Sequence, residues 1–338
     1  MKNNNISYAV SCVAAFLLLL SSCGEQQDRA TTESPQVSTT KEVKEVNVPS
    51  FNADSAYYFI EKQVSFGPRV PNTEPHRKTG KYLVGQLEKM GLKTYVQEFE
   101  AEAFDGTVLQ LKNIVGSINP EASKRILLAA HWDTRPFADQ DSEDTDVPID
   151  GANDGASGVG VLLELARVIQ SHENKPDVGI DIIFFDGEDY GQPEGSGDFK
   201  PDTWCLGSQY WARNKHKENY SAYYGILLDM VGGANAKFAL EGTSMKYAPS
   251  VMKKVWDTGN RLGYSNHFIY KQTAPITDDH YYVNTIAKIP MIDIIEYNPH
   301  GDGYFGDYWH THDDNMDVID RATLQAVGHT LLEVLYRE

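Results

Sequence analysis

Acidic and histidine side chains follow three short apolar runs of the sequence, at the point where each run ends. The runs and the residues after them are Ile180–Phe185 with Glu188 and Asp189, Ile126–Ala130 with His131, and Ile226–Leu228 with Asp229. Short β-branched or aromatic runs bounded by turn residues are typical of strands buried on both faces. Because ligands bind at the carboxyl ends of strands in open α/β sheets, we expect these polar side chains to meet at one edge.

Several acids at one buried edge are costly unless a cation neutralises them, so the pattern predicts a metal site. Zinc prefers histidine nitrogen and carboxylate oxygen, and a catalytic zinc takes about three protein ligands and keeps one open position. The candidate ligands are Asp154, Asp189 and His310, with His131 and Asp229 able to complete a second site. The alternative is a set of solvated, aspartate-rich turns, since acids are common turn formers.

Two acids could divide the chemistry at such a site. Glu188 and Asp189 are adjacent, so one can bind the metal while the other moves protons. Asp154 lies in a glycine-rich stretch, residues 151–158, just before a helical-period apolar stripe. Asp154 could therefore be a ligand held near the sheet or only the N-cap of that helix.

Strand-like and helix-like segments alternate along the chain, which predicts an α/β domain. The expected strands are Leu92–Phe99, Val108–Val115, Ile126–Ala130, Ile180–Phe185, Ile226–Leu228 and Ile289–Ile295, the first two as a hairpin. The expected helices begin near Asp54 and after Gly158 and cover Glu74–Met90, Leu206–Asn214, Pro249–Leu262 and Arg321–Tyr336.

Two irregular stretches lie close to the candidate residues. Residues 138–150 are rich in acids and predict a solvated loop, with a calcium site as the alternative. Residues 191–203 are rich in glycine, proline and aspartate, and a loop of this kind can form the wall of a pocket.

Composition bounds the remaining possibilities. The chain has 338 residues and a formal net charge of −18, which argues against binding to nucleic acid because that requires a basic face. Residues 51–338 are sufficient for one large domain. Cys12 and Cys23 lie at the N-terminal end, so Cys205 has no partner for an intramolecular disulfide and is expected to be a packed thiol.

The N-terminal segment predicts export from the cytoplasm. Lys2 precedes the apolar run Ala14–Leu20, which is too short to span a bilayer stably. The run ends in Leu-Ser-Ser-Cys-Gly, which resembles a bacterial lipobox and implies removal of residues 1–22 and lipid attachment to Cys23; an ordinary secretory signal is the alternative. Residues 23–50 read as a flexible tether, so we expect an extracytoplasmic, periplasm-facing domain anchored to a bacterial membrane.

Motifs spread over nearly the whole domain resemble a known family. They are GANDGASGVGVLLELA (151–166), FFDGED (184–189), LLDMVGG (227–233) and WHTHDDN (309–315), together with FGPR (66–69), HWDTRP (131–136) and DDH (278–280). This set is similar to the zinc exopeptidase-like group that includes the M28 aminopeptidases, and most similar to the animal-type glutaminyl cyclases and their bacterial relatives. The resemblance implies a three-layer α/β sandwich whose central sheet is mixed and mostly parallel, with helices on both faces.

The resemblance also implies roles for individual residues. One zinc per chain would be held by Asp154, Asp189 and His310, and Glu188 would carry protons. Asp229 and Asp278 would form the acid network behind Glu188, and Trp309 would line the pocket for the glutamine side chain. We assign His131 and Trp204 to the same pocket, Trp204 as the candidate for the family's second pocket tryptophan. The implied reaction converts the N-terminal glutamine of peptides and proteins to pyroglutamate with release of ammonia.

The sequence departs from the family pattern at three points. The family's acid pair is Glu-Glu, whereas this chain has Glu188-Asp189. The animal enzymes carry a disulfide near the site that this chain cannot form, and loop 191–203 aligns poorly with theirs.

The nearest rival is a di-zinc aminopeptidase, which would use His131, Asp154, Asp189, Asp229 and His310. Asp278 before Asp279 and Trp309 before His310 favour the cyclase.

Overall fold

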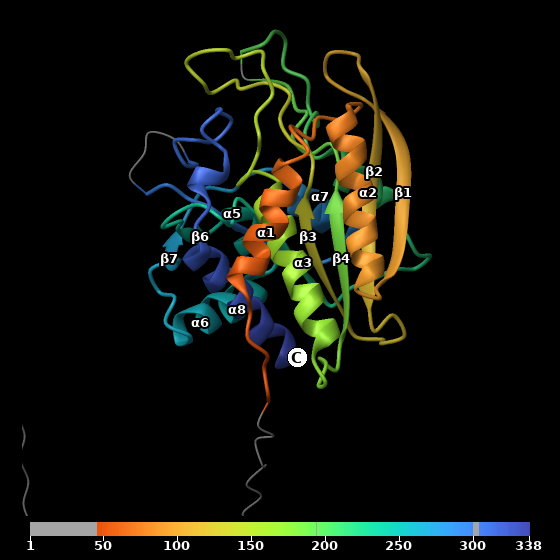
Figure 1. The fold of residues 1–338 in the computed structure, drawn as a ribbon, viewed down its shortest axis with the longest axis vertical. Helices are drawn as coiled ribbons and strands as arrows, with labels where there is room; N and C mark the ends of the chain where they lie inside the picture. The colour runs from red at the N-terminus through yellow and green to blue at the C-terminus, as the bar shows by residue number, and fades with distance from the viewer. Residues whose placement is uncertain (1–45, 194, 300–303) are drawn as a thin grey trace, which may run out of the picture. The chain divides into compact units, whose positions relative to one another are not determined.

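The computed structural model describes residues 46–193, 195–299 and 304–338, and a six-stranded sheet forms its centre (Figure 1). The order across the sheet is β1-β2-β4-β3-β5-β8. These strands are β1 (Lys93–Glu102), β2 (Val108–Ile118), β3 (Arg125–His131), β4 (Gly179–Phe185), β5 (Tyr224–Asp229) and β8 (Met291–Ile295). The pairs β4–β3, β3–β5 and β5–β8 are parallel, whereas β1–β2 and β2–β4 are antiparallel, so the predicted mixed sheet is confirmed.

The central strands are apolar because both of their faces are covered. Every residue of β3, β4, β5 and β8 is buried. Along β3, Ile126, Leu128 and Ala130 belong to the largest core cluster, whereas Leu127 and Ala129 belong to a second cluster. Since side chains alternate along a strand, the two clusters lie on opposite faces of the sheet.

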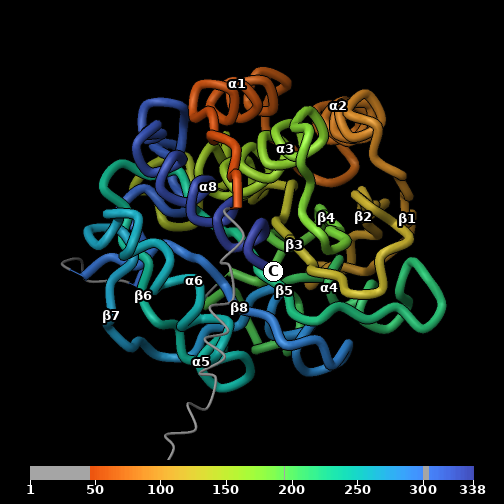
Figure 2. Tube along the Cα trace, turned by 90° about the horizontal axis from the view of Figure 1, so that it is seen from below, coloured from red at the N-terminus to blue at the C-terminus, as the bar shows by residue number. Residues whose placement is uncertain are grey.

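Helices cover both faces and complete the predicted three-layer sandwich (Figures 1 and 2). The face with the larger core is covered by α1 (Ala53–Val64), α2 (Glu74–Lys89), α3 (Ala156–Ser171), α6 (Pro249–Arg261) and α8 (Arg321–Tyr336). The other face carries α4 (Leu206–Arg213) and α7 (Asp279–Tyr282), which continues as a π-helical turn, Val283–Ala287. Smaller elements are α5 (Gly242–Tyr247), the 3₁₀ turn Met316–Val318, and β6 (Phe238–Leu240) paired in parallel with β7 (Phe268–Gln272).

Glycines let α3 lie unusually close to its neighbours. A Cβ atom built on Gly158 would lie 2.3 Å from the carbonyl oxygen of Leu228 in β5. A Cβ atom on Gly160 would lie 2.5 Å from Cγ1 of Ile60 in α1. The N-terminal turn of α3 is thereby held against the sheet edge, which fixes the position of Asp154 just before it.

The N-terminal part of the chain differs in one detail from the sequence-based expectation. Asn52, and not Asp54, caps α1, because the Asn52 side chain accepts a hydrogen bond from the backbone N–H of Ser55 at 3.0 Å. The predicted signal peptide, residues 1–22, and tether residues 23–45 lie outside the described residues. Among the helices of the described residues, none is long and apolar enough to span a bilayer.

The close approach of α3 predicts opposite effects for one substitution at two helical glycines. Gly158→Ala should lower the free energy of unfolding by about 2 kcal/mol or more, because the added methyl group meets backbone that cannot rotate away. Gly85→Ala in α2 should raise it by roughly 0.5–1 kcal/mol, because no atom of the described residues lies within 4 Å of its Cβ position and alanine is the better helix former. Urea unfolding curves of the two variants measure the difference, and equal shifts would contradict the packing described here.

Candidate metal and catalytic site

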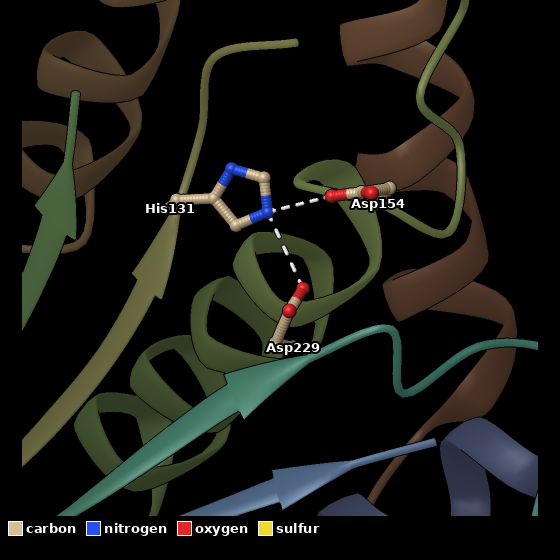
Figure 3. Close-up of side chains that lie close together, drawn as sticks. All are labelled: His131, Asp154 and Asp229. Carbon is tan, nitrogen blue, oxygen red and sulfur yellow. Dashed lines mark hydrogen bonds and ion pairs between the residues drawn. The ribbon is translucent and has the colours of Figure 1, made fainter. Parts of the chain in front are cut away.

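The predicted site residues meet at the carboxyl edge of the parallel strands. His131 ends β3, Asp229 ends β5, and Glu188 and Asp189 follow β4. Asp154 reaches them from the turn before α3, as Figure 3 shows for its approach to His131. The loop between β8 and α8 supplies a histidine and a tryptophan, so five separate segments contribute to one site.

Asp154, Asp189 and His310 form a compact and buried group of potential ligands. Nε2 of His310 lies 3.2 Å from Oδ1 of Asp189 and 3.7 Å from Oδ2 of Asp154. The three side chains are at most 3% exposed as residues. Apart from this contact with His310, neither carboxylate oxygen of Asp189 has a hydrogen-bond partner among the described residues. One nitrogen and two carboxylate groups are a donor set that zinc accepts, and unpartnered buried oxygens are costly without a cation. The residues present therefore fit a zinc ion.

The charge around His310 supports the same conclusion. Burial alone would lower the pKa of His310, but the Asp189 carboxylate and the contact with Asp139 outweigh it and raise that pKa to about 9. Burial raises the pKa of Asp189 to about 6, with the neighbouring Asp154 carboxylate adding to the shift. The three side chains thus favour a positive charge between them. That charge can be a proton or a metal cation that takes its place.

Two further carboxylates hold the ligand-bearing backbone in place. Asp314 accepts hydrogen bonds from the backbone N–H groups of Asn153 at 2.7 Å and Asp154 at 3.0 Å. Asp133 does the same for Glu188 and Asp189, both at 3.1 Å. The segments that carry Asp154 and Glu188-Asp189 are therefore each fixed by a buried carboxylate that accepts from two successive amides, which also satisfies those amides.

Two buried arginines complete this framework. Arg69 donates to the carbonyl oxygens of Trp132 at 3.1 Å and Gly151 at 2.6 Å, and so ties the segment after β3 to the turn before α3. Arg135 donates to the carbonyl oxygens of Asp189 at 2.8 Å and Gly191 at 2.9 Å. Both guanidinium groups are fully buried, so they also offset the negative charge of the site.

Arg135 acts on His310 through an acid. It binds both carboxylate oxygens of Asp139, at 2.9 and 2.8 Å, and Oδ1 of Asp139 lies 3.1 Å from Nδ1 of His310. A carboxylate behind a metal-binding histidine orients the ring and makes its free nitrogen a better ligand. The expectation of a wholly solvated loop over 138–150 is therefore wrong at its start, where Asp139 contacts His310 and Asp141 contacts His312.

A second group of ligands lies next to the first and shares Asp154. Nε2 of His131 is 2.9 Å from Oδ1 of Asp154 and 3.3 Å from Oδ1 of Asp229 (Figure 3). All three side chains are buried, and their ligand atoms lie within 4.8 Å of one another. The geometry of the side chains alone thus provides for either one metal ion or two.

Glu188 lies beside the proposed ligands with two partners of its own. Its Oε1 accepts a hydrogen bond from the Cys205 thiol at 3.1 Å, and it forms a compact group with Cys205 and Asp278. Burial and the adjacent carboxylate of Asp278 hold the pKa of Glu188 well above its ordinary value. Burial and Glu188 itself also raise the pKa of the Cys205 thiol, so this group stays protonated and remains a donor.

The acids predicted to lie behind Glu188, Asp229 and Asp278, line the same cavity as Glu188. The Asp278 side chain caps α7 by accepting a hydrogen bond from the backbone N–H of Asp279. Burial raises the pKa of Asp229 to about 7, and the Asp154 and Asp278 carboxylates contribute to this shift. Asp293 in β8 is completely buried, and in the described part of the chain neither of its carboxylate oxygens has a hydrogen-bond partner. Neighbouring acids of this kind can share protons, because not all of them can be ionised together.

These groups open into a cavity of about 280 Å³ with acids at its base and aromatic rings on its walls. The ring of Trp309 stacks on the ring of His310 at 3.8 Å between centroids, and Trp204 is parallel to the same ring at 5.8 Å. Arg135 lies over Trp204 at 4.3 Å from its centroid. Both tryptophans line the cavity, whereas His131 lies behind it, between Asp154 and Asp229.

The remaining residues of the cavity were not singled out from the sequence. The lining is completed by Gln140, Gln192, Met230, Ile276, Thr277, Ile295 and Phe305. Cys205 was expected to be only a packed thiol, and no sequence signal links it to Glu188. Arg135 and Asp314 do lie within the recognised motifs HWDTRP and WHTHDDN, which could have drawn attention to them.

Comparisons with known proteins agree with this geometry. The protein-family model described as Peptidase family M28 matches residues 113–335 of this chain. The chain is 26% identical over 304 residues to a glutaminyl-peptide cyclotransferase of Dictyostelium discoideum, covering 76% of this chain and 77% of that protein.

Two solved structures are much more similar. A glutaminyl cyclase of Tannerella forsythia is 55% identical, with a TM-score of 0.84 over 86% of this chain and 100% of that one. A protein of Parabacteroides distasonis described as a Zn-dependent exopeptidase is 53% identical, with the same TM-score and coverage. The sequence-based resemblance is confirmed.

The position of Asp139 behind His310 predicts an effect on metal affinity. Asp139→Asn should weaken zinc binding by about 10–100-fold, because the amide cannot orient and polarise His310 as the carboxylate does. Asp141→Asn is the matched control, since its carboxylate contacts His312. Competition with a chromophoric chelator measures both affinities, and wild-type zinc affinity in Asp139→Asn would contradict the assignment.

Proposed function

Because the chain belongs to peptidase family M28, we propose that it serves within that family as a glutaminyl-peptide cyclotransferase rather than as an aminopeptidase. The observation that carries the proposal is a cavity of about 280 Å³ that joins Asp154, Asp189 and His310 to Glu188, Asp229 and Asp278. A cavity of this size suits the terminal residue of a peptide. The acids at its base suit a reaction in which a proton is taken from one nitrogen and given to another.

The reaction needs no external nucleophile, because the α-amino group of the substrate attacks its own γ-amide carbon. The five-membered ring closes as the new C–N bond forms and the bond to the amide nitrogen breaks. Binding both groups in one small cavity orients the amine toward the amide carbon. Such orientation supplies a large part of the rate acceleration. Trp309 and Trp204 would confine the side chain between aromatic faces and exclude water from the reacting atoms.

Glu188 would move the proton in both directions. It takes a proton from the attacking amine and returns one to the departing ammonia, so that protons balance over the reaction. Its raised pKa suits this task, because a carboxylate with a higher proton affinity is a stronger base toward the attacking amine. Cys205 would position the carboxylate through its hydrogen bond, and Asp229 and Asp278 would hold protons behind it.

Zinc held by Asp154, Asp189 and His310 would supply a Lewis acid that polarises the γ-amide carbonyl. We infer one zinc ion per chain. The second group of ligands depends on Asp229. Burial, together with the Asp154 and Asp278 carboxylates, raises the pKa of Asp229 to about 7, which favours its protonated form and so would weaken it as a ligand. The di-zinc aminopeptidase is the alternative function, and the group His131, Asp154 and Asp229 is the observation that favours it.

Removal of the proposed proton carrier should separate catalysis from folding and metal binding. Glu188→Gln should lower ammonia release from a glutamine peptide by at least about 100-fold, because the amide cannot accept a proton. The zinc content and the urea unfolding midpoint should stay close to those of the wild type. Wild-type turnover in this variant would remove Glu188 from its assigned role.

Elemental analysis should find one zinc per chain after dialysis against metal-free buffer. A content of two tightly bound ions would contradict the inference from Asp278 and would favour the aminopeptidase.

For the N-terminal segment we propose cleavage before Cys23, lipid on that cysteine, and a tether that carries the catalytic domain on the periplasmic side of a bacterial membrane. The support is the short apolar run Ala14–Leu20 followed by small residues and a cysteine. Lipid-anchored proteins are labelled by palmitate, so the wild-type chain should incorporate it and fractionate with membranes. Cys23→Ser should lose the label, and a labelled Cys23→Ser chain would rule out the lipobox reading.

A further inference from the structure

A second cavity, of about 640 Å³, adjoins the site and shares lining residues with it. Gln192, Trp204 and Thr277 belong to both cavities. Three other surface cavities, lined by His76 and Lys112, by Tyr58 and Arg167, and by Asp181 and Tyr220, share no residue with the site. Among these cavities of the described chain, the adjoining one is therefore the one through which a bound molecule could extend out of the site.

Apolar and aromatic residues line this adjoining groove together with polar ones such as Lys200 and Asp202. One side consists of the loop formed by residues 191–193 and 195–203, which contributes Pro193, Phe199 and Pro201. The other side is formed by Thr277 and by Tyr282 of α7. Trp204, which stacks against His310, lies at the junction between this groove and the site cavity.

Internal hydrogen bonds give the loop a defined shape. The Gln192 side chain donates to the carbonyl oxygen of Asp198 at 3.0 Å and accepts from the backbone N–H of Lys200 at 2.9 Å. The Lys200 ammonium donates to the carbonyl oxygen of Phe104 at 2.6 Å. Tyr282 donates to Asp202 at 2.9 Å, which ties the end of the loop to α7 across the groove. A loop braced in this way presents a surface that a ligand can recognise.

Phe199 is the feature of this groove that folding does not explain. Its side chain is 86% exposed, the largest value among the exposed large hydrophobic residues of the described chain. An isolated apolar residue at a surface needs no explanation, but this one lies with two prolines and a tyrosine along the wall of a groove that opens from the site. Aromatic side chains contribute large contact areas at binding surfaces.

We propose that this groove binds the part of the peptide that follows the N-terminal glutamine, and that Phe199 favours substrates with an aromatic or bulky apolar side chain at the third position. The proposal rests on the proposed function, because that reaction places the terminal residue in the site cavity. The cavity of about 280 Å³ would hold that residue, and Trp204 and Thr277, which line both cavities, would lie where the remaining chain leaves it. The groove continues in that direction, so the downstream side chains meet Phe199, Pro201 and Tyr282.

The test compares three substrates: glutamine amide, Gln-Ala-Phe-amide and Gln-Ala-Ser-amide. In the wild type, kcat/KM should be about fivefold higher for the phenylalanine peptide than for the serine peptide, as expected for one additional aromatic contact. Phe199→Ser should reduce this ratio to about one. Its turnover of glutamine amide should be unchanged, because that substrate does not reach the groove.

Tyr223→Ser is the matched control, since Tyr223 is another exposed aromatic residue, 68% exposed, and lies outside the groove. This variant should keep the fivefold ratio. A kcat/KM ratio of one in the wild type, or a fivefold ratio that persists in Phe199→Ser, would overturn the proposal that this groove binds the peptide. Absence of ammonia from all three substrates with the wild type would overturn the proposed function, and the groove with it.

Discussion

The structure depends on one electrostatic constraint, which is the burial of several carboxylates at a single edge of the sheet. Asp154, Asp189, Asp229 and Asp278 are each at most 8% exposed, and Glu188 lies among them. Like charges at this density cannot all be ionised in a protein interior unless cations or hydrogen-bond donors compensate them. Three features of the fold compensate this negative charge: buried arginines, backbone amides and a group of ligands that fits a metal ion.

The first two kinds of compensation also provide positional accuracy. Asp133 and Asp314 each bind two successive amides of a ligand-bearing segment, and Arg69 and Arg135 bind the carbonyl oxygens of the same segments. The irregular backbone between strand and helix thereby gains hydrogen bonds to buried side chains where it passes the site. A zinc ion would complete the compensation and provide the electrophile for the reaction. The acids that remain can then serve as proton carriers.

The parts of this arrangement that follow from regular structure were predictable from the sequence. Apolar runs that end in Asp or His residues, such as the run before Asp229, identify strands whose ends must share one edge of the sheet. The glycine-rich stretch 151–158 likewise indicated that Asp154 could be held near the sheet. Contacts made by irregular loops were not predictable, because they join residues far apart in sequence without any periodic pattern. The hydrogen bond from Cys205 to Glu188 and the contact between Asp139 and His310 are of this kind. The position of Trp204 in the cavity wall also depends on such a loop.

The most direct test of the central claim is a paired assay on one purified preparation, with and without a zinc chelator. One substrate is a peptide that begins with glutamine, and the other is a leucine anilide. We expect chelator-sensitive release of ammonia from the glutamine peptide, while the anilide stays intact. Cleavage of the anilide without release of ammonia would contradict this account and would mean that the ligands at the sheet edge serve a peptidase.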